Sequence, residues 1–335
     1  MKFRAFPGTN VKVSKIGFGV WTVSSPWWGV TDDKVGLDLL RRAYDLGITF
    51  FDTADNYGNG KGETILAEAL GDKLDKIVIG SKWGYNFYDF QRQGQQELPQ
   101  DFSIPYLKRS IESSLKRLKR DHIDIYNLHN CRVDTIRKNE IFEALEGLKK
   151  EGKIRAYGVA LGPALNERQA EEGQVAITLQ KVHCVQIIYN LFEQMLGLAI
   201  FPVAQTSNSR MLVRVPHSSG LLEGKLRKDT AFSANDHRSF RKKEWLEEGL
   251  KKVDAIQFLL EDNARTLGQV DLQFVLAEPA VASVLPNIYN VEQLEEFALT
   301  PDLPGISPAH LEKLRDLYAK NFGVEHVAAA AQPAQ

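Results

Sequence analysis

Short apolar runs and longer amphipathic segments alternate along the chain. The apolar runs carry few polar positions, which is typical of strands that are buried on both faces. Their β-branched and aromatic residues, and the turn residues beside them, also favour strands. The predicted strands are residues 14–21, 49–53, 76–81, 123–128, 154–160, 185–189, 212–215 and 282–285.

Helix signals separate most of these runs. Thr31 can cap a helix that reaches Leu46, where a glycine follows as a stop. Ser103 opens another helix, whose apolar residues recur on one face. Further helices are predicted at 63–70 and 139–151, each followed by glycine. Strands that alternate with helices imply parallel strands joined by crossover helices.

Eight such units over this length favour a closed (β/α)8 TIM barrel. We expect one domain at residues 1–325 and a flexible, low-complexity tail at 326–335. Two connections, 83–102 and 220–243, are long enough to be functional loops.

Composition excludes several classes of function. The chain has 335 residues, with 42 Lys and Arg against 43 Asp and Glu, a balance that argues against a nucleic-acid binder. No apolar stretch approaches the ~20 residues of a membrane span, and the start lacks the apolar run of a secretory signal. Cys131 and Cys184 form no CxxC pattern and suit a reducing compartment, so we expect a cytoplasmic protein. No His/Cys cluster indicates a metal site.

Candidate catalytic residues stand where predicted strands end. Asp52 ends the second strand, Lys82 the third and His129 the fourth, while Tyr57 lies in the loop after Asp52. In a parallel barrel these strand ends meet at one face. Each residue alone has an ordinary structural explanation, such as a helix cap or core packing. All four at the ends of consecutive strands indicate a catalytic group.

These residue types suit the protonation of a carbonyl oxygen while hydride reaches its carbon. A phenol, with an ordinary pKa near ~10, is too weak an acid unless a cation lowers that value. Lys82 beside Tyr57 would supply the cation, and Asp52 would keep the buried lysine charged. His129 can donate a hydrogen bond that orients the carbonyl.

The sequence resembles the aldo-keto reductase family. The segments FDTADNYG (51–58) and IDIYNLHN (123–130) carry the most specific similarity, which extends over nearly the whole chain to about residue 322. The resemblance implies a TIM barrel that binds NADP(H) in an extended form, and it places Asp52, Tyr57, Lys82 and His129 in the family's four catalytic positions. The complete set favours a working enzyme.

The resemblance also implies cofactor-binding residues. Gln186 matches the glutamine that holds the nicotinamide carboxamide, although its usual Ser-Asn companions are Ala160-Leu161 here. Arg214 falls where relatives place a flat group against the nicotinamide, and a charged residue at the barrel rim is the alternative. The pyrophosphate loop corresponds to Gly220, Leu222, Gly224 and Lys225.

The adenosine end departs from the family pattern. Gln293 and Glu296 keep the adenine-side positions, and Asn287 belongs to the same motif, but Tyr289 stands where an arginine often holds the 2′-phosphate. Residues 225–243 contain seven Lys/Arg and two Asp, a local net charge of +5. We expect Arg238 to contact the 2′-phosphate, so that NADP(H) is preferred and NAD(H) is the alternative. A solvated basic loop is the competing explanation.

Aromatic residues surround the expected substrate site. Trp21 and Trp28 lie in or after the first predicted strand, Trp83 and Tyr85 follow Lys82, and His217 follows the seventh strand. Aromatic side chains of this kind can form the walls of a site for flat or sugar-like substrates. The alternative is that they only pack under the long loops.

We therefore expect an NAD(P)H-dependent reductase of aldehydes or ketones with a small carbonyl substrate and no nucleic-acid or membrane partner. A sugar or alcohol dehydrogenase that runs the same chemistry in reverse is the first alternative, and a nucleotide-sensing regulatory subunit is the second. The sequence leaves the physiological substrate and the oligomeric state open.

Overall fold

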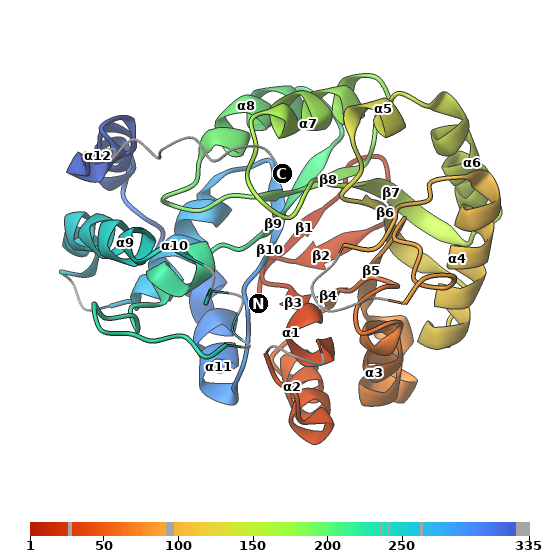
Figure 1. Cartoon of the computed structure of the whole chain (residues 1–335), viewed down its shortest axis with the longest axis horizontal. Coiled ribbons are helices and arrows are strands. Elements are labelled where there is room, and N and C mark those ends of the chain that lie inside the picture. The colour runs from red at the N-terminus through yellow and green to blue at the C-terminus, as the bar shows by residue number, and fades with distance from the viewer. Residues whose placement is uncertain are drawn as a thin grey trace.

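Eight parallel strands form a barrel in the computed structural model (Figure 1). The structure describes residues 1–25, 29–91, 97–234, 236, 238–239, 241–261 and 264–325. The predicted tail therefore lies outside the described residues. Each strand pairs with the next in sequence order: β3 (Phe18–Gly19), β4 (Phe50–Asp52), β5 (Val78–Trp83), β6 (Ile123–His129), β7 (Ile154–Ala160), β8 (Cys184–Ile188), β9 (Arg210–Arg214) and β10 (Val281–Leu285).

Helices ring the strands (Figure 1). Their apolar faces and the outward side chains of the strands form one large buried core. This layering confirms the (β/α)8 prediction. The helices are α1 (Trp21–Ser24), α2 (Asp33–Asp45), α3 (Lys61–Leu70), α4 (Ile104–Leu118), α5 (Val133–Ile136), α6 (Asn139–Lys150), α7 (Arg168–Thr178), α8 (Met195–Gln205), α9 (Lys243–Ala255), α10 (Leu267–Ala277), α11 (Val291–Leu299) and α12 (Pro308–Ala319).

The barrel closes just before β3. Ile16 forms a parallel bridge with Val284 of β10, and Gly17 N–H donates to the Val284 carbonyl at 2.9 Å. A Cβ at Gly17 would come within 2.8 Å of Leu285 and Phe50, so only glycine allows this close approach.

The prediction of one strand at 14–21 was wrong in extent. The segment is divided between β2 (Lys12–Ser14), the barrel strand β3 and helix α1, which already contains Trp21. Most other predicted boundaries are within two residues of the observed ones. Helix α2 is capped by Asp32 rather than Thr31, because Asp32 Oδ1 accepts the Lys34 N–H at 2.8 Å.

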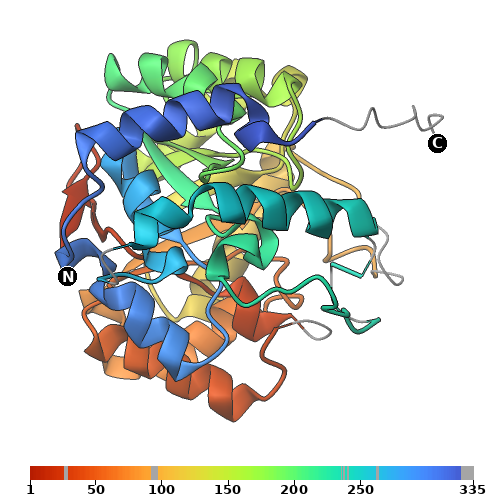
Figure 2. The same ribbon diagram turned by 90° about the vertical axis from the view of Figure 1, so that its left-hand side faces the viewer.

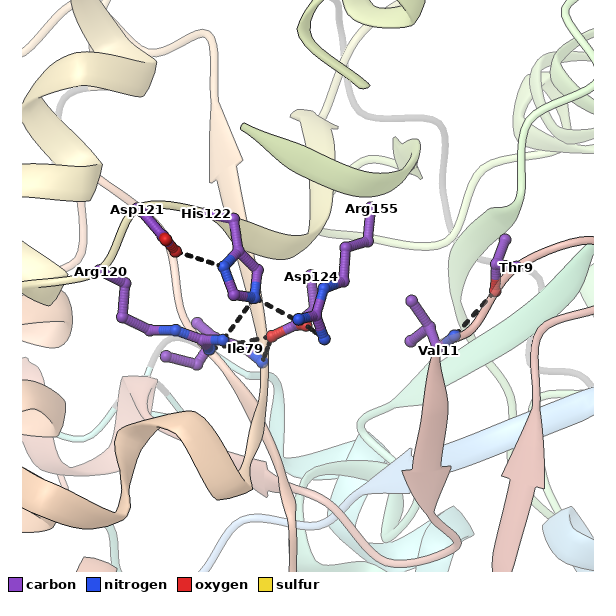
Figure 3. Close-up of polar contacts among 8 residues, drawn as sticks. All are labelled: Thr9, Val11, Ile79, Arg120, Asp121, His122, Asp124 and Arg155. Atoms are coloured by element: carbon purple, nitrogen blue, oxygen red, sulfur yellow. Dashed lines mark hydrogen bonds and ion pairs between the residues drawn. The ribbon is translucent and has the colours of Figure 1, made fainter. Parts of the chain in front are cut away.

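An N-terminal hairpin closes the amino-terminal end of the barrel. Its strands β1 (Phe3–Ala5) and β2 pair antiparallel, and the Thr9 hydroxyl accepts the Val11 N–H at 3.1 Å in its loop (Figure 3). The buried residues of the hairpin pack with the inward side chains of six barrel strands in a second core, which contains Phe6, Val11, Val13, Phe50, Ile125, Ala156, Cys184, Leu212, Ala282 and Leu285.

A buried carboxylate ties three strands together at this same end. Asp124 of β6 accepts the Ile79 N–H at 2.8 Å and pairs with Arg120 at 3.0 Å and Arg155 at 2.9 Å (Figure 3). His122 lies 3.6 Å away from the same carboxylate. Burial opposes the charged form of Asp124, but His122 and the arginines outweigh it and lower its pKa. Charged groups at the amino-terminal face of a barrel serve stability rather than chemistry.

Helices α9 and α12 lie over the same side of the barrel (Figure 2). The short turn Asn321–Gly323 contacts both helices, and Phe322 packs against Phe192 in the loop before α8. No helix in the described part of the chain is long and apolar enough to cross a bilayer.

Candidate active site

Four side chains meet at the carboxyl ends of three neighbouring strands. Asp52 is the last residue of β4, Lys82 is the second-last of β5 and His129 ends β6. Tyr57 comes from the loop between β4 and α3. Parallel barrel strands all end at one face, so the sheet itself brings these residues together.

Lys82 is the centre of this group. Its Nζ lies 2.5 Å from Asp52 Oδ2, 2.7 Å from the Thr53 carbonyl oxygen and 3.3 Å from the Tyr57 hydroxyl oxygen. The Lys82 side chain is 1% exposed and that of Asp52 is 6% exposed. The three donors of the ammonium are thus directed at a carboxylate, a carbonyl and a phenol, away from bulk water.

Electrostatics keeps Lys82 charged. Burial disfavours the ammonium, but the Asp52 carboxylate and the Tyr57 hydroxyl outweigh burial, so the pKa of Lys82 lies above its ordinary value. A positive charge is therefore held beside the Tyr57 oxygen over the whole physiological pH range.

His129 is buried and neutral. Burial lowers its pKa well below the ordinary value, and the positive charges of Lys82 and Arg214 lower it further. Its ring centroid lies 5.7 Å from that of Tyr57 and 5.0 Å from that of Tyr85. His129 Nδ1 has no hydrogen-bond partner among the described residues. A neutral imidazole in this position can donate a hydrogen bond to a ligand without adding charge.

The tryptophans that were predicted to line the substrate site differ in where they lie. The Trp21 ring packs edge-on against Tyr57, with centroids 4.8 Å apart. Trp83 is fully buried and packs edge-on against Phe102 at 5.4 Å, which makes it part of the core beneath the site. The predicted substrate residue Trp28 lies outside the described residues.

Tyr85 connects the four residues to the next loop. Its hydroxyl accepts from Asn130 Nδ2 at 2.9 Å and donates to Glu97 Oε1 at 2.5 Å, while its ring contacts His129. Burial raises the pKa of Tyr85, so its phenol stays protonated. Tyr85 is thus a fixed wall of the site.

His217 belongs to the loop after β9. It is buried, its ring lies 4.7 Å from the Phe297 ring, and its Nε2 is 3.3 Å from the Gly268 carbonyl oxygen. Burial lowers the pKa of His217 to about 4, so it is neutral. Its contacts place it among helices α10 and α11, and its substrate role stays a prediction.

Gln186 lies in the middle of β8, and Arg214 is the last residue of β9. Gln186 Nε2 donates to Asp52 Oδ1 at 3.0 Å, so the predicted carboxamide ligand also orients the carboxylate that holds Lys82. Arg214 donates to the carbonyl oxygens of Leu161, at 2.8 Å, and Gly162. Arg214 Nε is buried without a hydrogen-bond partner among the described residues.

The loop after β9 contains a run of left-handed residues. Ser218, Ser219 and Gly220 have φ values of 45°, 57° and 96°. The Ser218 and Gly220 N–H groups donate to the Val215 and His217 carbonyl oxygens, at 3.3 and 2.8 Å, which stabilises the turn. A Cβ at Gly220 would lie 2.9 Å from Arg238 Nη1, and Arg241 donates to the Ser219 hydroxyl at 2.9 Å. Two arginines therefore border this turn.

The remaining predicted cofactor residues lie around this turn. Leu222 is fully buried, whereas Gly224 and Lys225 are exposed, and Asn287 is half-buried. Glu296 accepts from the Thr266 hydroxyl at 2.5 Å. The positive charge of Arg238 and Arg241 beside this turn is suited to a phosphate group, so the role of these residues in cofactor binding stays a prediction.

Arg238 is already paired. It donates from Nε and Nη2 to the Asp236 carboxylate at 2.9 and 2.6 Å, and it stacks over the Phe232 ring at 4.6 Å. These contacts fix the guanidinium in one orientation beside the turn at Gly220.

The family model for the aldo/keto reductase family matches residues 15–316. The chain belongs to the aldo/keto reductase family. It is 28% identical over 305 residues to aldo-keto reductase YhdN of Bacillus subtilis, which covers 89% of this chain and 88% of that protein. It is 26% identical over 300 residues to an NADH-specific methylglyoxal reductase of Escherichia coli, covering 86% of this chain and 90% of that protein. The solved glycerol dehydrogenase AKR11B4 from Gluconobacter oxydans superimposes with a TM-score of 0.80, 26% identity and coverage of 99% of this chain and 98% of that chain.

Family membership gives the broad activity. As an aldo/keto reductase, the chain is an oxidoreductase that acts on carbonyl compounds with a nicotinamide cofactor. The structure shows how the side chains at the strand ends are positioned relative to one another.

This aldo/keto reductase has a largely buried acid, Glu223, that the sequence does not single out. Glu223 lies in the loop after β9, its side chain is 14% exposed, and its Oε2 accepts from Gln293 Nε2 at 3.0 Å. Burial raises the pKa of Glu223 to about 7, against the opposing effects of Lys225 and Arg238. The sequence showed only a glutamate in a glycine-rich loop, because its burial depends on helices far along the chain.

Proposed function

We propose that this chain reduces aldehydes or ketones, including sugar-like or aromatic ones, with Tyr57 as the proton donor. The observation that carries the proposal is the position of Lys82 Nζ, 3.3 Å from the Tyr57 oxygen and 2.5 Å from the Asp52 carboxylate. A phenol in contact with a buried cation is suited to giving up its proton.

Each residue of the chain has a distinct part in this proposal. The reduced nicotinamide, when bound, supplies the hydride. The Tyr57 O–H donates its proton to the carbonyl oxygen, and the Lys82 ammonium stabilises the negative charge that the proton leaves on the Tyr57 oxygen. Asp52 holds Lys82 charged, and neutral His129 donates a hydrogen bond that orients the carbonyl.

The test is a panel of aliphatic, aromatic and sugar-like carbonyls, assayed by NADPH and NADH oxidation. A reductase consumes cofactor at the expense of at least one class of carbonyl. A dehydrogenase, which the similarity to a glycerol dehydrogenase favours as the second candidate, instead turns over alcohols with NAD⁺ or NADP⁺ more efficiently. A regulatory subunit binds cofactor tightly and turns over neither set.

We propose that NADP(H) is preferred over NAD(H). Arg238 supports this proposal, because it borders the left-handed turn at Gly220 and its guanidinium is fixed by Asp236. Tyr289, which occupies the position of the usual arginine, leaves Arg238 as the cation for a 2′-phosphate. The proposed compartment is the cytoplasm, which the two buried free cysteines support.

Replacing Arg238 with alanine is expected to weaken NADPH binding about tenfold and to leave NADH binding almost unchanged, since only NADPH carries the 2′-phosphate. Both dissociation constants are measured by quenching of intrinsic fluorescence. Lys228→Ala, an exposed charge in the same loop, is the matched control. An unchanged ratio of the two constants in Arg238→Ala contradicts this assignment.

A further inference from the structure

A pocket of about 470 Å³ has Asn130, the residue after His129, in its wall. The loops after β5, β6 and β7 line it. The polar side chains of its wall include Glu97, Gln100, Asn130, Arg132 and Arg168. None of the four proposed catalytic residues is among the residues that line it.

Hydrogen bonds and a ring contact connect the pocket wall to His129. Asn130 directly follows His129, and Gln100 Nε2 donates to the carbonyl oxygens of both residues, at 2.9 Å to His129 and 3.3 Å to Asn130. Tyr85 touches the His129 ring and bonds to both Asn130 and Glu97. Asn130, Gln100 and Tyr85 therefore connect the pocket wall to His129 through direct contacts.

The polar groups of the pocket are incompletely satisfied. Asn130 is 8% exposed, and its Oδ1 has no hydrogen-bond partner among the described residues. Asn130 Oδ1 has almost no exposed surface, so this unpaired acceptor lies behind the pocket surface rather than on it. Asn130 also has φ of 54°, a conformation that asparagine tolerates better than most residues.

The charged side chains of the pocket differ in whether they already have a partner. Arg168 is held by both oxygens of Glu172, at 2.8 and 3.0 Å, and Glu97 is engaged by the Tyr85 hydroxyl at 2.5 Å. Arg132 is exposed, and within the described residues its guanidinium has neither an ion pair nor a hydrogen bond. An unengaged guanidinium presents paired donors that match a carboxylate or a phosphate.

We propose that the carbonyl substrate carries an anionic group, a carboxylate or a phosphate, which binds Arg132 in this pocket while the carbonyl lies at Tyr57 and His129. Arg132 then determines substrate specificity and takes no part in the chemical step. This inference rests on the Proposed function, since it places the substrate's carbonyl at the catalytic group. It narrows the substrate class from carbonyls in general to acidic ones.

The test compares matched pairs of aldehydes in the wild type and in Arg132→Ala. Terephthalaldehydic acid with its methyl ester tests the carboxylate, and phosphorylated glyceraldehyde with glyceraldehyde tests the phosphate. In the wild type, kcat/KM is expected to favour the anionic member of at least one pair. In Arg132→Ala this preference falls about 10- to 100-fold, because a charge-assisted pair is lost.

Further readouts separate a binding role from a structural one. The loss in Arg132→Ala should lie in KM rather than in kcat, because the anion is bound equally in the ground state and the transition state. Arg132→Lys should restore part of the preference. Arg137→Ala is the matched control, because Arg137 is also exposed in this loop but pairs with Glu171 outside the pocket.

Two failures have different meanings. An enzyme that reduces neutral aldehydes, but shows no anion preference or keeps it in Arg132→Ala, overturns this inference and leaves the Proposed function standing. An enzyme that reduces no carbonyl of any charge overturns both.

Discussion

Tyr57→Phe is expected to lower kcat by at least ~10²–10⁴-fold while cofactor affinity stays within about twofold. The variant removes only the proton donor and keeps the ring that packs edge-on against Trp21 at 4.8 Å. Steady-state reduction of the best carbonyl from the panel gives kcat, and fluorescence titration gives the cofactor dissociation constant. Because the ring is retained, the fold should be unaffected.

Two controls make this result specific. Tyr44→Phe removes a partly buried hydroxyl on α2, far from the strand ends, and should leave kcat unchanged. Urea unfolding of Tyr57→Phe should match the wild type. Near-normal turnover in Tyr57→Phe would contradict the assignment of the proton donor.

Asp52→Asn is expected to cost about 3–5 kcal/mol of unfolding free energy together with most of the activity, because it leaves a buried lysine without its counter-charge. Lys82 is 1% exposed, so water cannot replace the lost carboxylate. The amide retains the shape of Asp52, which separates the loss of charge from the loss of volume. Urea-induced unfolding near neutral pH measures the difference.

The pH dependence gives this expectation a definite sign. In the wild type the pKa of Lys82 is higher in the folded state than in the unfolded state. The contribution of Lys82 to the free energy of unfolding is therefore complete below the unfolded-state pKa and is lost as the pH rises through the folded-state pKa. In Asp52→Asn, unopposed burial should place the folded-state pKa of Lys82 below the unfolded value of about 10.4. The stability deficit of the variant should therefore shrink as pH rises toward that value.

A double variant provides the control. Asp52→Asn combined with Lys82→Met removes both charges, so it should be less destabilised than the sum of the two single variants by about 1–3 kcal/mol. Strict additivity would mean that the short contact between Asp52 and Lys82 does not stabilise the fold.

Local patterns were sufficient to predict the architecture. Side-chain periodicity distinguishes strands from helices, and a helical crossover between successive strands lets them run parallel. Strand ends at Asp52, Lys82 and His129 then had to share one face, which the structure bears out. The errors fell at 14–21, where a hairpin strand, the barrel closure and a helix follow one another without a change in hydrophobicity.

Other features depended on contacts between distant segments. The sequence placed Trp83 with the substrate residues, but packing against Phe102 makes it part of the core. The same sequence gave no sign that Glu223 is buried against Gln293, 70 residues away. Burial, and with it the pKa, is a property of the folded environment rather than of the residue.

The sequence by itself predicted the barrel from periodicity and the family from the segments FDTADNYG and IDIYNLHN. The fixed direction of parallel strands then placed Asp52, Lys82 and His129 at one face. The tertiary structure decided which distant charges and loops meet. Arg168 pairs with Glu172 one turn along the same helix, but the loops that surround Arg132 come from separate parts of the chain. Which cation remains for a substrate depends on three loops that meet in space, and no local pattern in the chain encodes that meeting.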